Sequence, residues 1–371
     1  MVSIISAEEY FQFDAMNQSL LKSYSLKDPR LISKDRPESD FFYEEKAHFI
    51  IGSAVDCILT EGIEAFKAKY YISNLTKKPS LVQKSIINEV YSKLLETTQL
   101  FGIETIEDPA CEDLIFMSCV SHNHYDNIKD KIKKVATITK HQVCKDYFLD
   151  LKNAGTRTVL DMTEYDLILN VVNSLSTNTA TADYFKTNQP EGIKIYNQFG
   201  IVFMYRDVLC KALLDMVVIN EIDKTITPVD LKTTSKPTYD FDKAVRERRY
   251  DVQAAWYTLA LEELIKVDPN FMGYTILPFK FIAESTTTPG MPLVLTCDEE
   301  LLNIGRYGEL EGYVGNSDGT QNELIFKREI LGFEQMLHLY LHYEEVGYSK
   351  HPNYEAADGQ FTLSWHKIQK L

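Results

Sequence analysis

Apolar residues recur along the chain with two different periods. From Leu75 to Ala182 they follow helical spacing, as in residues 82–101 and 163–175. From residue 193 onward they form short runs typical of strands, found at 193–205, 208–219, 226–232, 272–285 and 292–300. Within the first of these runs we expect a turn at Phe199 and Gly200. The residues after Glu299 again predict helices.

These patterns predict an α/β fold in which a meander of strands is flanked by helices. We expect one domain over residues 1–371. It would carry a mainly helical insertion at about 75–190 and a helical C-terminal region at about 299–371.

Two of the predicted strands carry charged residues where burial favours apolar ones. Asp215 interrupts an otherwise apolar run, and the next strand carries Asp230 and Lys232. A carboxylate in a buried strand loses much of its hydration energy, so it persists only beside a cation or a full set of donors. The turn at 220–224 can place the two strands side by side. Asp230 and Lys232, two residues apart, then point to one face.

Such a group of residues suits a divalent metal. Two acidic side chains, the Leu231 carbonyl and water form a hard-oxygen site for Mg²⁺ or Mn²⁺. Asp215 and Asp230 would bind the metal. Lys232 would hold or activate the attacking water and stabilise negative charge on a phosphate. The alternative is a surface hairpin whose Asp and Lys side chains are solvated or paired with each other.

The helix predicted from Pro237 to Leu264 adds further polar residues, namely Arg246, Arg248, Arg249, Gln253 and Tyr257. Gln253 and Tyr257 are four residues apart and share a helix face, where an amide and a phenol can orient a ligand or contact DNA. The arginines can grip phosphates bidentately. The alternative is an ordinary amphipathic helix whose basic first turns face solvent.

The order of these residues resembles that of the PD-(D/E)XK nuclease superfamily. Its motif positions are matched by Asp215 in the first position, by Asp230, Leu231 and Lys232 as the D-x-K, and by Gln253 and Tyr257 as the helix motif of the RecB-like branch. VDLKTT followed by RRYDVQAAWYTLAL is most similar to exodeoxyribonuclease VIII (RecE-type) exonucleases of phages and prophages. The resemblance implies a restriction-endonuclease-like core with a central mixed sheet flanked by helices.

Two earlier segments extend the resemblance. Residues 16–24 are similar to the start of such nuclease domains, and residues 49–62 resemble their Gly-x-x-x-His helix. Here Asp56 follows Gly52 by four residues, where the family usually has a metal-binding histidine. An aspartate can ligate Mg²⁺ as well as a histidine can, which makes Asp56 a candidate ligand. Alternatively, the substitution weakens the site or the match is out of register.

The resemblance implies a metal-dependent deoxyribonuclease that hydrolyses DNA phosphodiester bonds, most similar to a 5′–3′ double-strand exonuclease of phage-type recombination. It further implies double-stranded DNA ends as substrate, a homo-oligomeric ring and a single-strand annealing protein as partner. Two alternatives stay open on the same fold. One is a catalytically impaired DNA-binding or structural protein, and the other is an endonuclease in defence or repair.

The distribution of charged residues limits the parts of the chain that could bind DNA. The net charge of −15 means that phosphate contacts must come from local basic patches. Besides the arginines named above, one candidate patch consists of Lys22, Lys27, Arg30, Lys34 and Arg36. Each patch could equally be a solvated face. Glu284 is expected to face outward by strand alternation and to have no role in the site.

Composition and cysteine usage suggest the cellular setting. The six cysteines are scattered without a C-x-x-C pair, which fits reduced thiols in the cytoplasm of a bacterial or phage-infected cell and predicts no iron–sulfur cluster. No apolar run approaches the roughly 18 residues of a membrane span, so no membrane partner is expected. The N-terminal segment MVSIISAEEYFQF lacks the basic start of a signal peptide.

Overall fold

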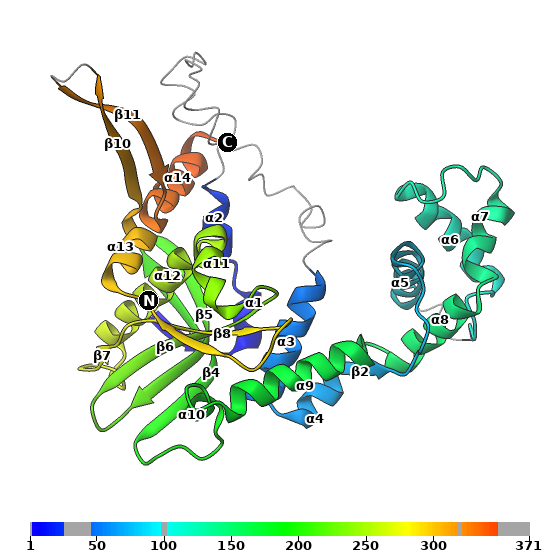
Figure 1. Ribbon diagram of the computed structural model, residues 1–371, viewed down its shortest axis with the longest axis horizontal. Helices are drawn as coiled ribbons and strands as arrows, with labels where there is room; N and C mark the ends of the chain where they lie inside the picture. Colours follow the sequence, from blue (N-terminus) through cyan, green and yellow to red (C-terminus); the bar gives the residue numbers. More distant parts are fainter. Residues whose placement is uncertain (1, 26–45, 98–101, 318–320, 348–371) are drawn as a thin grey trace. The chain divides into compact units, whose positions relative to one another are not determined.

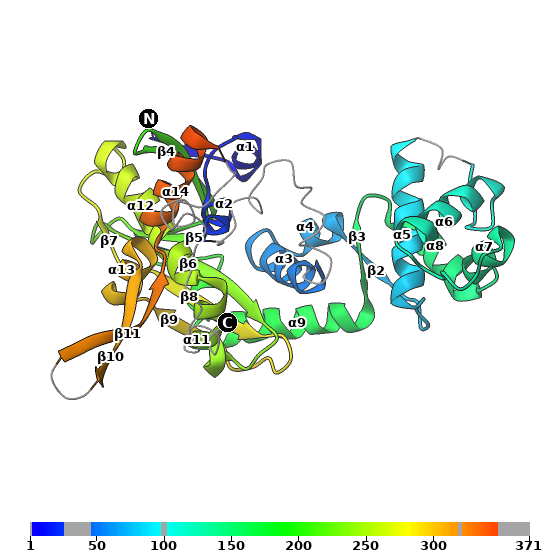
Figure 2. The ribbon, with the colours of Figure 1, turned by 90° about the horizontal axis from the view of Figure 1, so that it is seen from above.

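The computed structural model describes residues 2–25, 46–97, 102–317 and 321–347. Two compact units are present, one formed by residues 1–52 and 171–371 and the other by residues 53–170. Most of the helical section predicted from Leu75 lies in the second unit. Figures 1 and 2 show the elements of both units along the chain.

The first unit is built on a seven-stranded sheet. Its strands are β1 (Val2–Ile5), β4 (Ile193–Tyr205), β5 (Val208–Asn220), β6 (Thr225–Thr234), β7 (Thr275–Ile276), β8 (Lys280–Ser285) and β9 (Leu293–Thr296). The order is β1-β4-β5-β6-β8-β9, with β7 also paired to β6. The β6–β8 and β6–β7 pairs are parallel and the others are antiparallel. The expected α/β architecture with a central mixed sheet is therefore confirmed.

Among its described residues, the helical elements that lie wholly in this unit are α1 (Ala7–Gln12), α2 (Gln18–Ser23), α10 (Ala182–Phe185), η3 (Thr238–Asp240), α11 (Phe241–Arg248), α12 (Tyr250–Val267), α13 (Glu299–Tyr307) and α14 (Phe333–Val346). Helix α3 (Lys46–Thr60) and helix α9 (Met162–Thr177) each contain the boundary between the units. Helix α12 packs on β1, β4, β5 and β7, so it is the central helix on the sheet.

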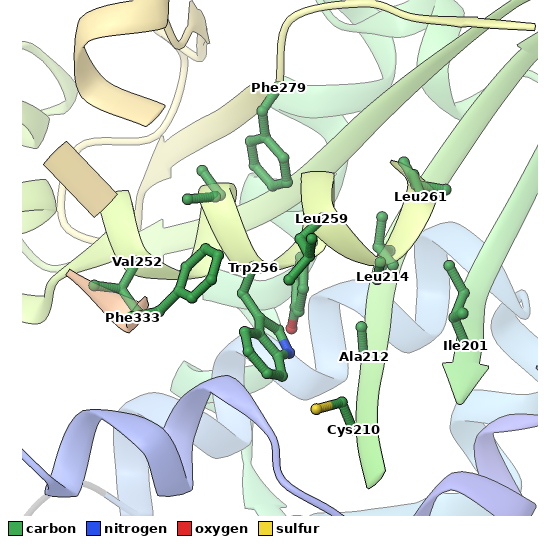
Figure 3. Close-up of a cluster of buried hydrophobic side chains, with 14 of the residues drawn as sticks. Ile201, Cys210, Ala212, Leu214, Val252, Trp256, Leu259, Leu261, Phe279 and Phe333 are labelled. Carbon is green, nitrogen blue, oxygen red and sulfur yellow. The ribbon is translucent and has the colours of Figure 1, made fainter. Parts of the chain in front are cut away.

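The core of this unit forms where α12 meets the sheet. Trp256 is fully buried, and its indole Nε1 donates a hydrogen bond to the Lys211 carbonyl of β5 at 3.1 Å. Figure 3 shows its ring between β5 and Phe333 of α14. Because a buried indole N–H needs an acceptor, this bond fixes α12 along β5 as well as satisfying the donor. Helix α12 is thereby held against the strand that carries Asp215.

The turn expected at Phe199 and Gly200 is wrong, because β4 runs unbroken through both residues. Gly200 pairs with Ile5 of β1. A Cβ at position 200 would lie 2.6 Å from the Ile5 carbonyl oxygen. The glycine therefore permits a close approach of two strands.

The strands β4 and β5 share an irregularity at one level. Their ladder passes from the Asn197–Met216 pair to the Phe199–Leu214 pair and skips Gln198 and Asp215. Gln198 has a left-handed backbone with φ 51°. Leu214 and Val217 both belong to the core under α12. Side chains three residues apart on a regular strand point to opposite faces, so β5 must change its face between these two residues. Asp215 lies at this change.

The helix expected over 237–264 is broken into three parts. It begins as η3, continues as α11 and restarts as α12 after Arg249, whose φ of 52° is left-handed. A single non-glycine residue in this conformation is unusual and needs support from its surroundings. The side-chain contacts of Arg249, given below with the site, supply that support.

The region after Glu299 also differs from the helical expectation. Helices α13 and α14 are present, but residues between them form an antiparallel hairpin of β10 (Glu309–Ser317) and β11 (Gln321–Ile330). These two strands form a sheet of their own, which Figure 1 shows beside α13 and α14. The printed sequence has three glycines at 312, 315 and 319, which lower helix propensity there. The residues from 348 to 371 lie outside the described part of the chain.

The second unit is mainly helical. Its elements are α4 (Ile63–Lys69), β2 (Tyr70–Ser73), α5 (Leu81–Glu96), α6 (Pro109–Ser121), α7 (Lys131–Thr139), α8 (Gln142–Ala154) and β3 (Thr158–Asp161). Strands β2 and β3 pair in parallel, and a separate hydrophobic core joins α5 to α8. Across the described residues, no helix combines the length and the apolar character that a membrane span requires.

Candidate active site

Asp215 occupies a fork between β5 and β6. The ladder between these strands ends at the Met216–Val229 pair. Beyond it, the Leu231 backbone N–H donates to Asp215 Oδ2 at 3.0 Å. A side-chain oxygen thus accepts the hydrogen bond that a strand carbonyl would otherwise accept, as expected for a buried amide that must find a partner.

Asp230 lies on β6 just before this point and is fully buried. Its Oδ1 accepts a hydrogen bond from the Gln253 Nε2 of α12 at 2.7 Å. Its Oδ2 lies 2.6 Å from the Lys232 ammonium in an ion pair. Each carboxylate oxygen therefore has one polar neighbour, which offsets part of the hydration that Asp230 loses on burial.

Lys232 is held between two carboxylates and an aromatic ring. Burial alone would lower the pKa of its ammonium, but Asp230 and Asp215 outweigh burial and raise the pKa above the usual value. The ammonium lies 5.0 Å from the centre of the Tyr250 ring, within range of a cation–π contact. Its side chain is 19% exposed, so Lys232 is less deeply buried than Asp230.

Tyr257 follows Gln253 by one turn of α12 and is buried. Burial raises the pKa of its phenol well above the usual value, and the negative charges of Asp230 and Asp215 add to this effect. The phenol therefore keeps its proton at neutral pH and can only donate a hydrogen bond to an anion. Because Asp215 and Asp230 perturb both Tyr257 and Lys232, these four side chains form one electrostatic group.

The predicted arginines separate into two kinds. Arg249 is engaged: its Nε and Nη2 donate to the buried Asp251 carboxylate at 2.8–3.2 Å, and Nη2 also donates to the Leu331 carbonyl at 2.7 Å. These contacts support its left-handed backbone and occupy the Nε and Nη2 donors of its guanidinium group. Arg246 and Arg248 are exposed, and neither guanidinium bonds to any residue in the described part of the chain.

Lys22 of α2 is the part of the basic patch 22–36 that the structure describes. Its ammonium donates to the Arg248 carbonyl at 3.2 Å, at the C-terminal end of α11. Lys27, Arg30, Lys34 and Arg36 lie outside the described residues. Sequence reasoning placed Lys22 in a charged patch, but it gave no signal that this lysine would reach the α11–α12 junction.

Asp56 lies on α3, in the unit formed by residues 53–170. Burial raises the pKa of Tyr70 in that unit to about 12, and the charges of Cys57, Asp56 and Glu61 add to the shift. Whether Asp56 acts together with Asp215 and Asp230 stays a prediction.

The carboxylates of the site limit the kind of metal binding that the chain could support. No three His, Cys, Asp or Glu side chains stand together as a metal-binding group among the residues the structure describes. Asp215 and Asp230 form a smaller set. Mg²⁺ in proteins is commonly bound through one or two carboxylates, with water and substrate phosphate completing its shell. The two side chains fit a largely hydrated Mg²⁺ and do not fit a metal enclosed by protein ligands.

Glu284 does not face outward as alternation predicted. It is fully buried on β8, where its carboxylate accepts hydrogen bonds from the Ser174 hydroxyl, from the Ser285 N–H at 2.7 Å and from the Gly290 N–H at 3.3 Å. Three donors satisfy a buried carboxylate without a cation. Glu284 thus anchors the loop that follows β8, and its serine- and threonine-rich neighbours were the available signal.

Comparison with known proteins gives little further information. No protein-family model matches the chain, and no curated protein matches it. Among solved structures, the chain is similar to a crystal structure of a "putative exonuclease" from Eubacterium rectale, at 15% sequence identity and a TM-score of 0.29. That similarity covers 62% of this chain and 80% of the other.

Proposed function

We propose that this chain is a metal-dependent deoxyribonuclease that hydrolyses DNA phosphodiester bonds. The observation that carries the proposal is the fully buried Asp230, held between Gln253 and Lys232 beside the fork where Asp215 interrupts the sheet. Charged groups in such a position reduce stability, so their presence is best explained by a chemical role.

In the proposed reaction, Asp215 and Asp230 would hold Mg²⁺ or Mn²⁺ together with the Leu231 carbonyl. When bound, the metal lowers the pKa of water and polarises a phosphate oxygen. Gln253 fixes the orientation of the Asp230 carboxylate through the 2.7 Å hydrogen bond. The Asp230 carboxylate, already paired with Lys232, would be one of the groups that hold the metal.

Lys232 acts in this scheme as a charged donor. In the metal-free chain Asp230 and Asp215 raise the pKa of Lys232, which favours its protonated form. Its ammonium would position the attacking water and stabilise negative charge that develops on the phosphate. Tyr257, which also keeps its proton, would donate a hydrogen bond in the same region.

The finer description comes from the resemblance of the motifs. It includes 5′–3′ digestion of double-stranded DNA ends in phage-type recombination, assembly into a homo-oligomeric ring and cooperation with a single-strand annealing protein. Exposed Arg246 and Arg248 are the proposed contacts to the DNA backbone. Arg249 belongs to the junction that positions them.

A catalytically impaired DNA-binding protein is the second candidate. Two observations favour it, namely the lack of a three-ligand group in the described part of the chain and the Asp56 that stands where the related nucleases usually have histidine. An endonuclease would share the same side chains and differ in how DNA reaches them.

The decisive experiment compares linear and covalently closed duplex DNA in the presence of Mg²⁺ or Mn²⁺. Loss of linear DNA alone supports an exonuclease, and cutting of both forms supports an endonuclease. Asp230→Asn should abolish either activity, whereas the exposed turn residue Asp223→Asn is a matched control that should not. Folded wild-type protein that binds DNA and cuts neither form with either metal would favour the impaired candidate.

A further inference from the structure

Two ammonium groups converge on the junction between α11 and α12. The Lys22 ammonium is hydrogen-bonded to the carbonyl of residue 248 at 3.2 Å, and the Lys232 ammonium lies 5.0 Å from the ring centre of residue 250. The two cations come from segments that are far apart in sequence, on α2 and β6. Their meeting place is next to Asp230, which Lys232 contacts directly.

The segment that carries Lys22 is firmly held. Asn17 caps α2 by accepting from two backbone N–H groups, and Leu21 and Tyr24 are buried in the main core. Just before the helix, the Met16 N–H donates to the Leu209 carbonyl, and the Met16 carbonyl accepts from the Lys211 N–H. The backbone position of Lys22 is therefore set by the core and by β5, since both ends of its helix are anchored.

Lys22 differs from its charged neighbours in lacking a carboxylate partner. Arg249 is paired with Asp251 and Lys232 is paired with Asp230. Within the described part of the chain, the only polar contact of the Lys22 ammonium is the neutral carbonyl at residue 248. A cation that forms no direct ion pair with a carboxylate is suited to an external anion.

The energetics of this ammonium agree with an anion as its missing partner. Burial lowers the pKa of Lys22 to about 8, and the like charge of Lys232 contributes in the same direction. Arg249 also lowers it, while Asp251 and Asp230 raise it. A phosphate beside this nitrogen would favour the protonated form.

We propose that Lys22 binds a backbone phosphate of DNA next to the position occupied by the phosphate undergoing hydrolysis. The proposal rests on the nuclease function proposed above, and it adds a contact from the N-terminal helix to that site. In this arrangement Lys22 and Lys232 bind neighbouring parts of one strand, and the exposed Arg248 side chain lies on the residue whose carbonyl Lys22 contacts. Lys22 is thus a substrate-positioning residue.

A structural role for Lys22 is the competing explanation, because a lysine at the C-terminal end of a helix satisfies a free carbonyl and interacts favourably with the helix dipole. The two roles differ in their response to salt. Each phosphate that a protein neutralises contributes a slope of about −0.9 to the plot of log affinity against log salt concentration. A residue that only caps α11 contributes nothing to this slope.

The test uses the full chain with Ca²⁺ in place of Mg²⁺ and a fluorescent DNA duplex, titrated between about 50 and 200 mM salt. Lys22→Gln keeps a donor for the carbonyl but removes the charge, and Lys22→Met removes both. We expect each to weaken binding roughly tenfold at low salt and to make the slope shallower by about 0.9. Lys22→Arg should restore the slope. Lys243→Met is the matched control, since Lys243 is exposed and paired with Asp240.

The outcomes separate the two proposals. If the wild-type protein neither binds nor hydrolyses DNA, the nuclease function fails and the role of Lys22 fails with it. If the wild type binds DNA and Lys22→Gln keeps the wild-type slope, Lys22 is a helix cap only. Should Lys22→Met not fold, Lys22→Gln alone decides, because it preserves the hydrogen bond to residue 248.

Discussion

Replacement of Lys232 by methionine should destabilise the protein by an amount that depends on pH. The change keeps most of the side-chain volume and removes the cation that lies 2.6 Å from the fully buried Asp230. Breaking a buried pair in this way costs about 3–5 kcal/mol, because the remaining charge is uncompensated. The partial exposure of Lys232 places the value toward the lower end of this range.

Proton uptake sets an upper limit on that cost. An aspartate in an unfolded chain has a pKa of about 3.9, so protonating it costs about 4 kcal/mol at pH 7 and about 1.5 kcal/mol at pH 5. Where the uncompensated charge costs more than this amount, the variant protonates the aspartate instead. The penalty therefore begins above the pKa of the unfolded state and grows as pH rises. We expect about 3–4 kcal/mol at pH 7 and no more than about 1.5 kcal/mol at pH 5.

Urea unfolding followed by tryptophan fluorescence measures this difference. In a Trp365→Phe background, the fully buried Trp256 is the sole tryptophan and reports on the unit that contains the site. The double variant Lys232→Met with Asp230→Asn should recover most of the lost stability, because it removes both charges. An equal loss at both pH values, or a double variant as unstable as the single one, would refute the buried-charge reasoning.

Three further outcomes follow from the structure. Gly305→Ala should lower the free energy of unfolding by about 2 kcal/mol or more in urea unfolding, since its Cβ would lie 2.1 Å from the Asp251 carbonyl oxygen. Glu284→Gln should cost about 1–3 kcal/mol in the same assay, because the amide nitrogen that replaces one carboxylate oxygen cannot accept the hydrogen bonds made to that oxygen; the exposed Glu191→Gln should cost nothing measurable, and equal losses would contradict this account. As burial lowers the pKa of Lys22 to about 8, the unfolded chain binds this proton more tightly, so wild-type stability should rise between about pH 8 and 10.5. Melting curves of Lys22→Met should lack this rise, and an identical pH profile would argue against the lowered pKa.

The pattern of apolar residues along each strand was enough to identify the charged residues that interrupt it. Asp215 and Asp230 stood out because carboxylates in apolar strands demand partners, and the partners Lys232 and Gln253 are present in the structure. The α/β fold also followed from the change of period at residue 193, whereas the central mixed sheet was implied by the resemblance of the motifs. Their catalytic roles stay predictions.

What could not be predicted depends on contacts between distant segments. Gly200 suggested a turn, yet its reason is the close approach of Ile5 from the N-terminal strand. Arg249 suggested a DNA contact, yet its donors meet the Leu331 carbonyl, which lies 82 positions later. The alternating pattern placed Glu284 outward, because the pattern within one strand does not show that Ser174 and the following loop cover that face. In each case a partner remote in sequence decides the role of the residue.

The fork between β5 and β6 has a consequence for the interpretation of mutagenesis. Asp215 is charged, and its carboxylate also takes the place of a backbone carbonyl, because it accepts the hydrogen bond from the Leu231 N–H. Truncation at 215 would leave that amide without its acceptor and allow the strand bearing Asp230 to shift. An inactive Asp215→Ala protein would therefore be ambiguous between lost chemistry and displaced backbone. Asp215→Asn, which retains a carbonyl oxygen for the amide, is the substitution from which a catalytic role could be read.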